Sequence, residues 1–177
     1  MSIKTRIRTS LVDMSIKQYR YLTAALLFIW MMVIFLFSSQ NGQLSSNVSE
    51  GFAAKLFSII YPTFRDMSAE EKTVFLKTVM LPVRKLAHFT LYFVLGFLSS
   101  LLFVTIKKYG IYIKGIISWG FCVLYAVSDE IHQYFVPNRV CAFGDILIDS
   151  SGALLSVAIF VAVICTVKRF QKYKKFI

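Results

Sequence analysis

One stretch of the chain combines charged, imidazole and amide side chains directly after an apolar run. It contains Asp129, Glu130, His132 and Gln133, and Arg139 follows beyond a proline. Inside a membrane each charged side chain costs about 2.5 to 3.5 kcal/mol on insertion scales, so such residues usually face a helix-bundle interior or a wet cavity. Side chains of these types can carry out acid–base chemistry and can bind an anion. We therefore predict that the rest of the chain positions this cluster.

The composition places the chain in a membrane. Of its 177 residues 57% are hydrophobic and only 16% are charged, and the mean hydropathy is +0.66. This leaves too little polar surface to cover a soluble protein of this size. The net charge of +11 is shared among basic blocks beside apolar spans. We therefore interpret it as a signal for membrane topology and expect no nucleic-acid partner.

Four apolar segments predict an all-α fold, an integral membrane four-helix bundle over residues 21–167. The first segment is uncharged and long enough to cross most of a hydrocarbon core. The spans are expected at about 21–37, 86–106, 111–127 extending toward 135, and 145–167. Basic tails, 1–20 and 168–177, flank this transmembrane domain.

The distribution of Lys and Arg predicts the orientation of the bundle. Most of them lie in the two tails and around a short loop at Lys107, Lys108 and Lys114. Positively charged segments stay on the cytoplasmic side, so we expect both the N- and the C-terminus in the cytoplasm. The start of the second helix, the end of the third and the start of the fourth then lie together at the outer surface.

The segment 38–81 is expected outside the cell and predicts two short amphipathic helices. Apolar residues recur at helical spacing in its first half, from Val48 onward. Ser68 and Glu71 form a capping box ahead of a second apolar stripe. We expect the second helix to end before Pro82, because proline disfavours helix at the residue that precedes it.

Polar residues of three predicted helices converge at the outer end of the bundle. Helical spacing places several of them on one face of each helix, whereas Glu130 is turned by about 100° from its neighbours. Small residues on the fourth helix permit close approach of another helix. We therefore predict one polar pocket that opens to the outer leaflet. The shared faces consist of Lys85, His88 and Tyr92; Tyr125, Asp129, His132, Gln133 and Val136; and Asp145, Asp149, Gly152 and Ser156.

The order and spacing of these residues resemble the VanZ-like membrane proteins, a family named for a protein associated with low-level teicoplanin resistance. Four motifs match, and the one that begins at Ser128 is the most specific. Asp149 stands where the family usually has Asn, and Ser156 where it often has Gly. The motifs are Ser38-Ser39-Gln40; Arg84-Lys85-x-x-His88 with Phe89 and Tyr92; Ser128-Asp129-Glu130-x-His132-Gln133-x-Phe135-x-Pro137-x-Arg139; and Asp145-x-x-x-Asp149-x-x-Gly152.

The resemblance implies a multi-pass protein of the bacterial cytoplasmic membrane, in a Gram-positive envelope, with an effect on sensitivity to teicoplanin-type glycopeptides. Ser39 and Gln40 belong to the motif after the first span. The ligand-binding candidates are Arg84, Lys85, His88, Tyr92, Asp129, Glu130, His132, Gln133, Arg139, Asp145 and Asp149.

Three functions are compatible with these residues. The favoured one is recognition of an anionic lipid headgroup or lipid-linked wall precursor, in which Arg offers a bidentate fork and Lys a point charge. The second is an enzyme that uses His88, His132, Asp129 or Glu130 in acid–base chemistry, although no known nucleophile or phosphate-binding motif occurs. The third is internal pairing of the charges that only holds the helices together. We expect no metal and no cofactor, and the sequence predicts no oligomeric state.

Overall fold

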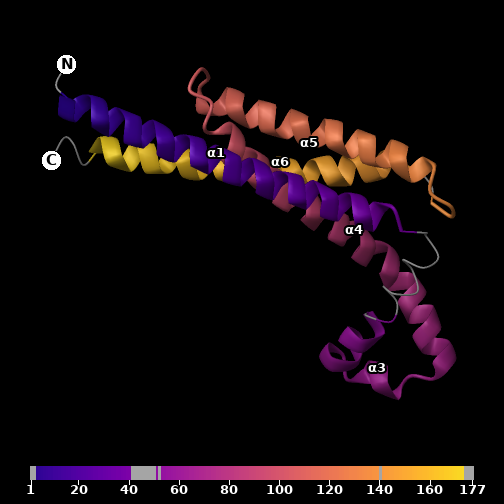
Figure 1. The fold of residues 1–177 in the computed structure, drawn as a ribbon. Coiled ribbons are helices and arrows are strands. Elements are labelled where there is room, and N and C mark those ends of the chain that lie inside the picture. Colours follow the sequence, from indigo (N-terminus) through magenta and orange to yellow (C-terminus); the bar gives the residue numbers. More distant parts are fainter. Residues whose placement is uncertain (1–2, 41–50, 52, 140, 174–177) are drawn as a thin grey trace.

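The computed structural model describes residues 3–40, 51, 53–139 and 141–173, which are helical apart from short connections (Figure 1). The helices are α1 (Ile3–Ser38), α3 (Thr63–Asp66), α4 (Ala69–Phe103), α5 (Ile111–Tyr134) and α6 (Phe143–Tyr173). Four of them contain segments long and apolar enough to cross a membrane, namely Ser15–Ser38, Ala69–Phe103, Ile111–Tyr134 and Phe143–Gln171. The predicted all-α fold with four spanning helices is confirmed.

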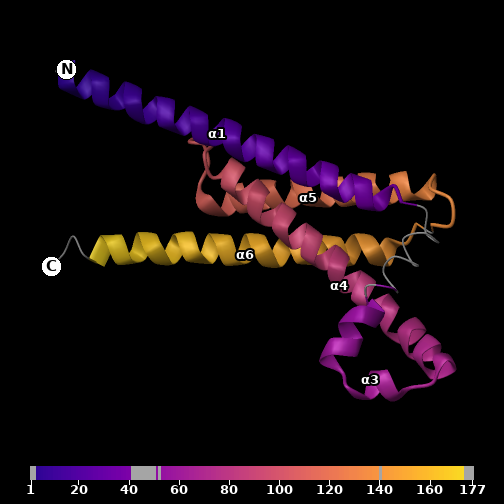
Figure 2. The ribbon, with the colours of Figure 1, turned by 60° about the horizontal axis from the view of Figure 1, so that its bottom comes forward.

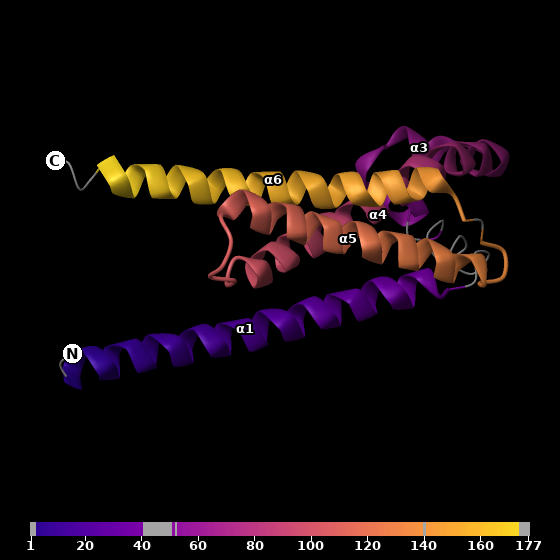
Figure 3. The same cartoon turned by 90° about the horizontal axis from the view of Figure 1, so that it is seen from above.

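The long helices alternate in direction. The helices α1 and α5 run one way, and α4 and α6 run the other way, so both termini and the α4–α5 connection lie at one end (Figure 1). The end of α1 and the α5–α6 connection lie at the opposite end. The helix α6 packs against α4 and α5, whereas α1 packs against α4 and α5 on the side away from α6 (Figure 3). The three predicted polar segments therefore meet at one end of the bundle.

Small residues allow α4 and α6 to cross at short range. A Cβ atom on Gly152 would lie 2.2 Å from the carbonyl oxygen of Phe89, and one on Gly96 would lie 2.7 Å from that of Ala153. Neither position tolerates a side chain without a shift of backbone, so the crossing is fixed by these two glycines. The close approach predicted at Gly152 is thus observed, and it sets the polar residues of α4 beside those of α6.

The core of the bundle is apolar in its middle and is completed by α1. Tyr92, Leu95, Cys122 and Ala126 are fully buried between the helices. The helix α1 contributes buried Leu27 and Ile34 to the same cluster. In this middle part of the bundle, a hydrogen bond from Trp30 Nε1 to the Leu91 carbonyl (2.9 Å) and one from the Tyr125 hydroxyl to the Met31 carbonyl (2.7 Å) attach α1.

A small lobe precedes the bundle, formed by the helical residues 53–60, by α3 and by the first turns of α4 (Figure 2). Its interior is aromatic, with the Phe75 ring 5.2 Å from Phe57 and 5.5 Å from Phe64. The capping box is confirmed, since the Ser68 hydroxyl accepts from the Glu71 amide and the Glu71 carboxylate accepts from the Ser68 amide. The beginning of the predicted first amphipathic helix, near Val48, lies outside the described residues.

The predicted helix boundary at Pro82 is wrong. Pro82 lies inside α4, which continues from the lobe into the bundle without interruption. A proline inside a helix costs about 3 kcal/mol because it removes a backbone hydrogen bond and crowds the preceding turn. The helix is nevertheless held on both sides of Pro82, by Phe75 in the lobe and by the crossing with α6 at Phe89. The lobe is therefore attached to the bundle through a single helix.

Further helix ends differ from the predicted spans. The helix α1 begins at Ile3, within the segment predicted as a basic tail, and α6 continues to Tyr173. The second spanning helix ends at Phe103 and not at residue 106. Lys and Arg are good helix formers, so basic flanks extend a spanning helix into the polar region without interrupting it. The outermost tail residues, 1–2 and 174–177, lie outside the described part.

Candidate functional site

The α5–α6 connection places Arg139. The helix α5 ends at Tyr134, and Asn138 takes a left-handed backbone conformation (φ 58°), which Asn tolerates better than most residues. The following Arg139 donates from Nε to the Gln40 carbonyl (3.2 Å) and from Nη2 to the Phe37 carbonyl (3.1 Å). The Phe37 carbonyl lies in the last turn of α1, where unpaired carbonyls carry partial negative charge, and Gln40 follows the end of the helix. Arg139 therefore ties the connection to α1.

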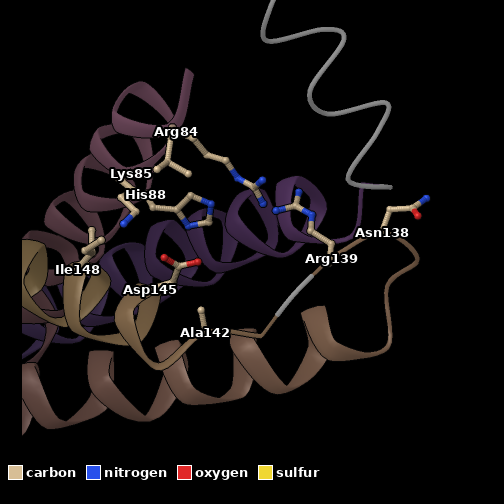
Figure 4. A pocket seen from close by; sticks show the side chains of 9 residues that line it. Arg84, Lys85, His88, Asn138, Arg139, Ala142, Asp145 and Ile148 are labelled. Atoms are coloured by element: carbon tan, nitrogen blue, oxygen red, sulfur yellow. The ribbon is translucent and has the colours of Figure 1, made fainter. Parts of the chain in front are cut away.

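An open pocket lies between α4, this connection and the first turns of α6. Its volume is about 320 Å³. Figure 4 shows the side chains that surround it, with basic groups from α4 on one side and Asp145 from α6 below them. We call it the cationic pocket, and its lining consists of Leu81, Arg84, Lys85, His88, Asn138, Arg139, Ala142, Asp145 and Ile148.

Two guanidinium groups share the cationic pocket. The side chains of Arg84 and Arg139 point toward one another although they come from α4 and from the α5–α6 connection (Figure 4). Burial lowers the pKa of Arg139, and the positive charge of Arg84 lowers it further. A guanidinium stays charged in a protein all the same. Nη1 of Arg139 is buried and has no hydrogen-bond partner among the described residues, so this donor is available to a ligand.

His88 lies at the inner edge of the pocket, next to a buried carboxylate. Its Nδ1 atom is 3.6 Å from Oδ1 of Asp149, and the two side chains are 20% and 0% exposed. This contact is the one salt bridge found among the described residues, and neither oxygen of Asp149 has a hydrogen-bond partner there. The close crossing of Phe89 and Gly152 brings the two residues together. Asp149 can therefore orient the imidazole ring toward the pocket.

A second group of polar residues is buried between α1 and α5. The Ser38 hydroxyl and the Gln133 amide both donate to Oδ2 of Asp129, at 2.8 Å and 3.0 Å. These three side chains are at most 3% exposed. Beside them the Ser39 hydroxyl lies 3.0 Å from Nε2 of His132. Ser39 and His132 are half-buried, and we call these five residues together the buried network.

Glu130 connects α5 to the start of α6. Its side chain is 1% exposed, and Oε2 accepts a hydrogen bond from the Ala142 amide at 3.0 Å. The predicted turn of Glu130 away from Asp129 agrees with these different partners. Tyr92 is fully buried, its ring centroid lies 6.2 Å from that of Tyr125, and its hydroxyl has no partner among the described residues.

The structure thus brings the predicted site residues to one end of the bundle and divides them between two environments. Gln40 contributes its backbone carbonyl to Arg139, while its side chain is exposed. The pocket holds Arg84, Lys85, His88, Arg139 and Asp145, whereas Tyr92, Asp129, Glu130, His132, Gln133 and Asp149 lie outside its lining.

Some contributors were not among the predicted ligand-binding residues. Ser38 carries the contact to Asp129, and its place in the motif Ser38-Ser39-Gln40 is a signal that could have identified it. Leu81 and Ile148 line the pocket as apolar residues and carry no such signal, because spanning helices are rich in them. Among the described residues no three His, Cys, Asp or Glu side chains are arranged to hold a metal ion.

Comparison with known proteins identifies the family of the chain. No match was found among curated proteins or among solved structures. A family model described as VanZ/LLP1 matches residues 23–165, which include every spanning segment in whole or in large part. The chain therefore belongs to the VanZ/LLP1 family of membrane proteins.

Proposed function

We propose that this protein binds an anionic lipid headgroup or a lipid-linked wall precursor in the cationic pocket. The observation that carries the proposal is the convergence of Arg84, Lys85 and Arg139 on one open cavity. Arg offers paired donors that match phosphate oxygens, and Lys adds a point charge. Among the described residues, neither Arg84 nor Lys85 forms a salt bridge that would neutralise it.

The position of the pocket within the bundle favours a ligand that resides in a membrane. The pocket lies where α4 leaves the spanning bundle for the lobe and where α6 enters it. Apolar Leu81 and Ile148 line it together with the charged groups. A molecule with a charged head and an apolar tail satisfies both kinds of lining, which a small polar solute does not.

The proposed location is the outer leaflet of a bacterial cytoplasmic membrane. The basic segments gather at the end of the bundle that holds both termini, and such segments stay in the cytoplasm. The pocket is at the other end and so faces outward. Teicoplanin-type glycopeptides act on this side, and we propose lower sensitivity to them as the consequence in the cell.

The buried network supports a second, architectural role for part of the cluster. Oδ2 of Asp129 accepts from both Ser38 and Gln133, so this oxygen is engaged within the protein, whereas Oδ1 has no hydrogen-bond partner among the described residues. Of the four catalytic candidates, Asp129, Glu130 and His132 lie outside the pocket lining, and His88 lies within it. A single histidine without a nucleophile favours binding over catalysis.

The test compares lipid binding by three forms of the full-length protein. Arg84→Gln combined with Lys85→Gln removes two exposed cations of the pocket, and Lys77→Gln removes an exposed cation of the same helix two turns away. Native mass spectrometry in detergent with added anionic lipid should show a loss of bound lipid of at least about tenfold for the double variant only.

Two further measurements decide between binding and architecture. Thermal unfolding should be the same for the parent and the double variant, because neither replaced side chain is buried. Cells that express the double variant should lose any decrease in glycopeptide sensitivity that the parent confers. Equal lipid binding by all three forms would reject the proposed binding site.

A further inference from the structure

The lining of the cationic pocket has an excess of positive charge that suits a particular class of anion. Three permanent cations, Arg84, Lys85 and Arg139, face one lining carboxylate, Asp145, which leaves a net charge of +2. A phosphomonoester carries about 1.5 to 2 negative charges at neutral pH, and a phosphodiester carries about one. The monoester therefore neutralises the lining more completely.

The arrangement of the two guanidinium groups adds a geometric reason. Arg84 and Arg139 point toward one another from different elements, so an anion between them is gripped from two sides (Figure 4). Each fork engages two oxygens when it binds in bidentate fashion. A terminal phosphate presents three free oxygens and one ester link, whereas a diester presents two free oxygens and two bulky substituents. The terminal phosphate can offer two oxygens to the Arg84 fork and its third to Nη1 of Arg139, which is the nitrogen that α1 leaves unpaired, whereas a diester has no third free oxygen.

Two other features favour a phosphate at the same place. Ala142, directly before α6, and Asp145, in its first turn, line the pocket, and the N-terminal end of a helix attracts anions. Nη1 of Arg139 is a buried donor without a partner among the described residues, although Nε and Nη2 are engaged by α1. An acceptor at Nη1 would remove the cost of this unpaired donor.

We infer that the cationic pocket selects a terminal phosphate, that is a phosphomonoester or the end of a diphosphate, over a phosphodiester headgroup. The inference rests on the proposed function and specifies its ligand class. Arg84 and Arg139 are the residues that impose the selection. Lys85 adds charge without the same preference, because an ammonium group has no fork that matches a pair of oxygens.

The experiment presents two lipids with the same acyl chains to the full-length protein in phosphatidylcholine nanodiscs. Phosphatidate is the monoester and phosphatidylglycerol is the diester, and native mass spectrometry counts the molecules of each that stay bound. We expect a preference for phosphatidate of at least about tenfold in the parent. Arg84→Gln should reduce this preference toward unity, and Lys77→Gln should leave it unchanged.

A second variant tests the charge argument in the opposite direction. Asp145→Asn removes the lining carboxylate and should strengthen the binding of both lipids several-fold, since the lining then no longer repels an anion with a negative charge of its own. An unchanged affinity in this variant would contradict the charge argument. Competition by water-soluble glycerol phosphate identifies a free phosphate as the source of the ligand, and lack of competition identifies a lipid.

The outcomes separate the two proposals. One result is that the parent binds phosphatidate and phosphatidylglycerol equally and that the Arg84→Gln Lys85→Gln double variant loses both. This result would overturn the selection of a terminal phosphate but would support the proposed binding of an anionic headgroup. Binding of both lipids that does not depend on Arg84 or Lys85 overturns the proposed function itself. Thermal unfolding of each variant shows whether a loss of binding reflects a loss of fold.

Discussion

The cationic pocket and the buried network lie at the same end of the bundle but differ in how their polar groups are satisfied. In the buried network Asp129 has two donors within the protein, Ser38 and Gln133. In the cationic pocket Arg84 and Lys85 are exposed and form no salt bridge among the described residues. Groups that are paired internally stabilise a fold, and groups that are left open are available to a ligand. The same end of the bundle thus combines side chains paired within the protein with exposed cations.

The comparison has a practical consequence. A substitution in the buried network should change the free energy of unfolding, and one in the cationic pocket should change binding while the fold is retained. Loss of a phenotype alone cannot distinguish the two regions. Stability and binding therefore have to be measured together on each variant.

The largest effect is expected where both regions depend on the crossing of α4 and α6. Gly152→Ala places a Cβ atom 2.2 Å from the Phe89 carbonyl oxygen, which forces the helices apart. Overpacking of this kind costs about 1 to 3 kcal/mol or more, so the melting temperature in detergent should fall strongly and the His88–Asp149 contact should be lost. Gly120→Ala is the control, because nothing lies within 4 Å of a Cβ atom there and Ala favours helix. Similar melting of both variants would refute the assigned crossing.

A smaller loss of stability is expected for a substitution in the buried network. Asp129→Ala removes the acceptor of the Ser38 hydroxyl, at a cost of about 1 to 3 kcal/mol in total, whereas the Gln133 amide keeps its longer contact with the Ser38 hydroxyl (3.4 Å). Asp129→Asn keeps an acceptor oxygen and should retain part of this stability. Chemical denaturation of both variants, with Arg84→Ala as the pocket counterpart, measures the difference. If Arg84→Ala lowers stability as much as Asp129→Ala, the division into two regions is wrong.

The architecture could be predicted because it depends on patterns that are local in the sequence. Uncharged apolar runs determine the spanning helices, and the capping residues Ser68 and Glu71 mark the start of α4. The predicted helix boundary at Pro82 was wrong because tertiary contacts on both sides of the proline hold a helix that local preference would end. Local rules describe the unfolded chain's preferences and not the packing that overrides them.

The sequence could predict which residues gather at the site, but not which of them line the cationic pocket and which form the buried network. Helical spacing identified the polar faces of α4, α5 and α6, and alternating helix directions brought them to one end. Whether a side chain faces the pocket or the interior depends on which helix lies opposite. Asp129 is buried because α1 supplies Ser38, and Asp145 lines the pocket because the chain turns at Asn138. These pairings join residues far apart in sequence, which spacing does not reveal.

Arg139 belongs to both regions and gives the sharpest test of the comparison. Two of its nitrogens hold the carbonyls of Phe37 and Gln40 at the end of α1, and its guanidinium also faces Arg84 across the pocket. Arg139→Lys keeps the charge but cannot reproduce both bonds, so we expect a loss of about 1 kcal/mol in stability and, with it, weaker binding of phosphatidate. Arg84→Lys should weaken binding to a similar extent with no change in stability. Equilibrium unfolding and lipid binding, measured on this matched pair of variants, separate the two roles. A loss of stability in both variants would mean that Arg84 is also structural. A loss of binding in Arg84→Lys alone would restrict Arg139 to the attachment of α1.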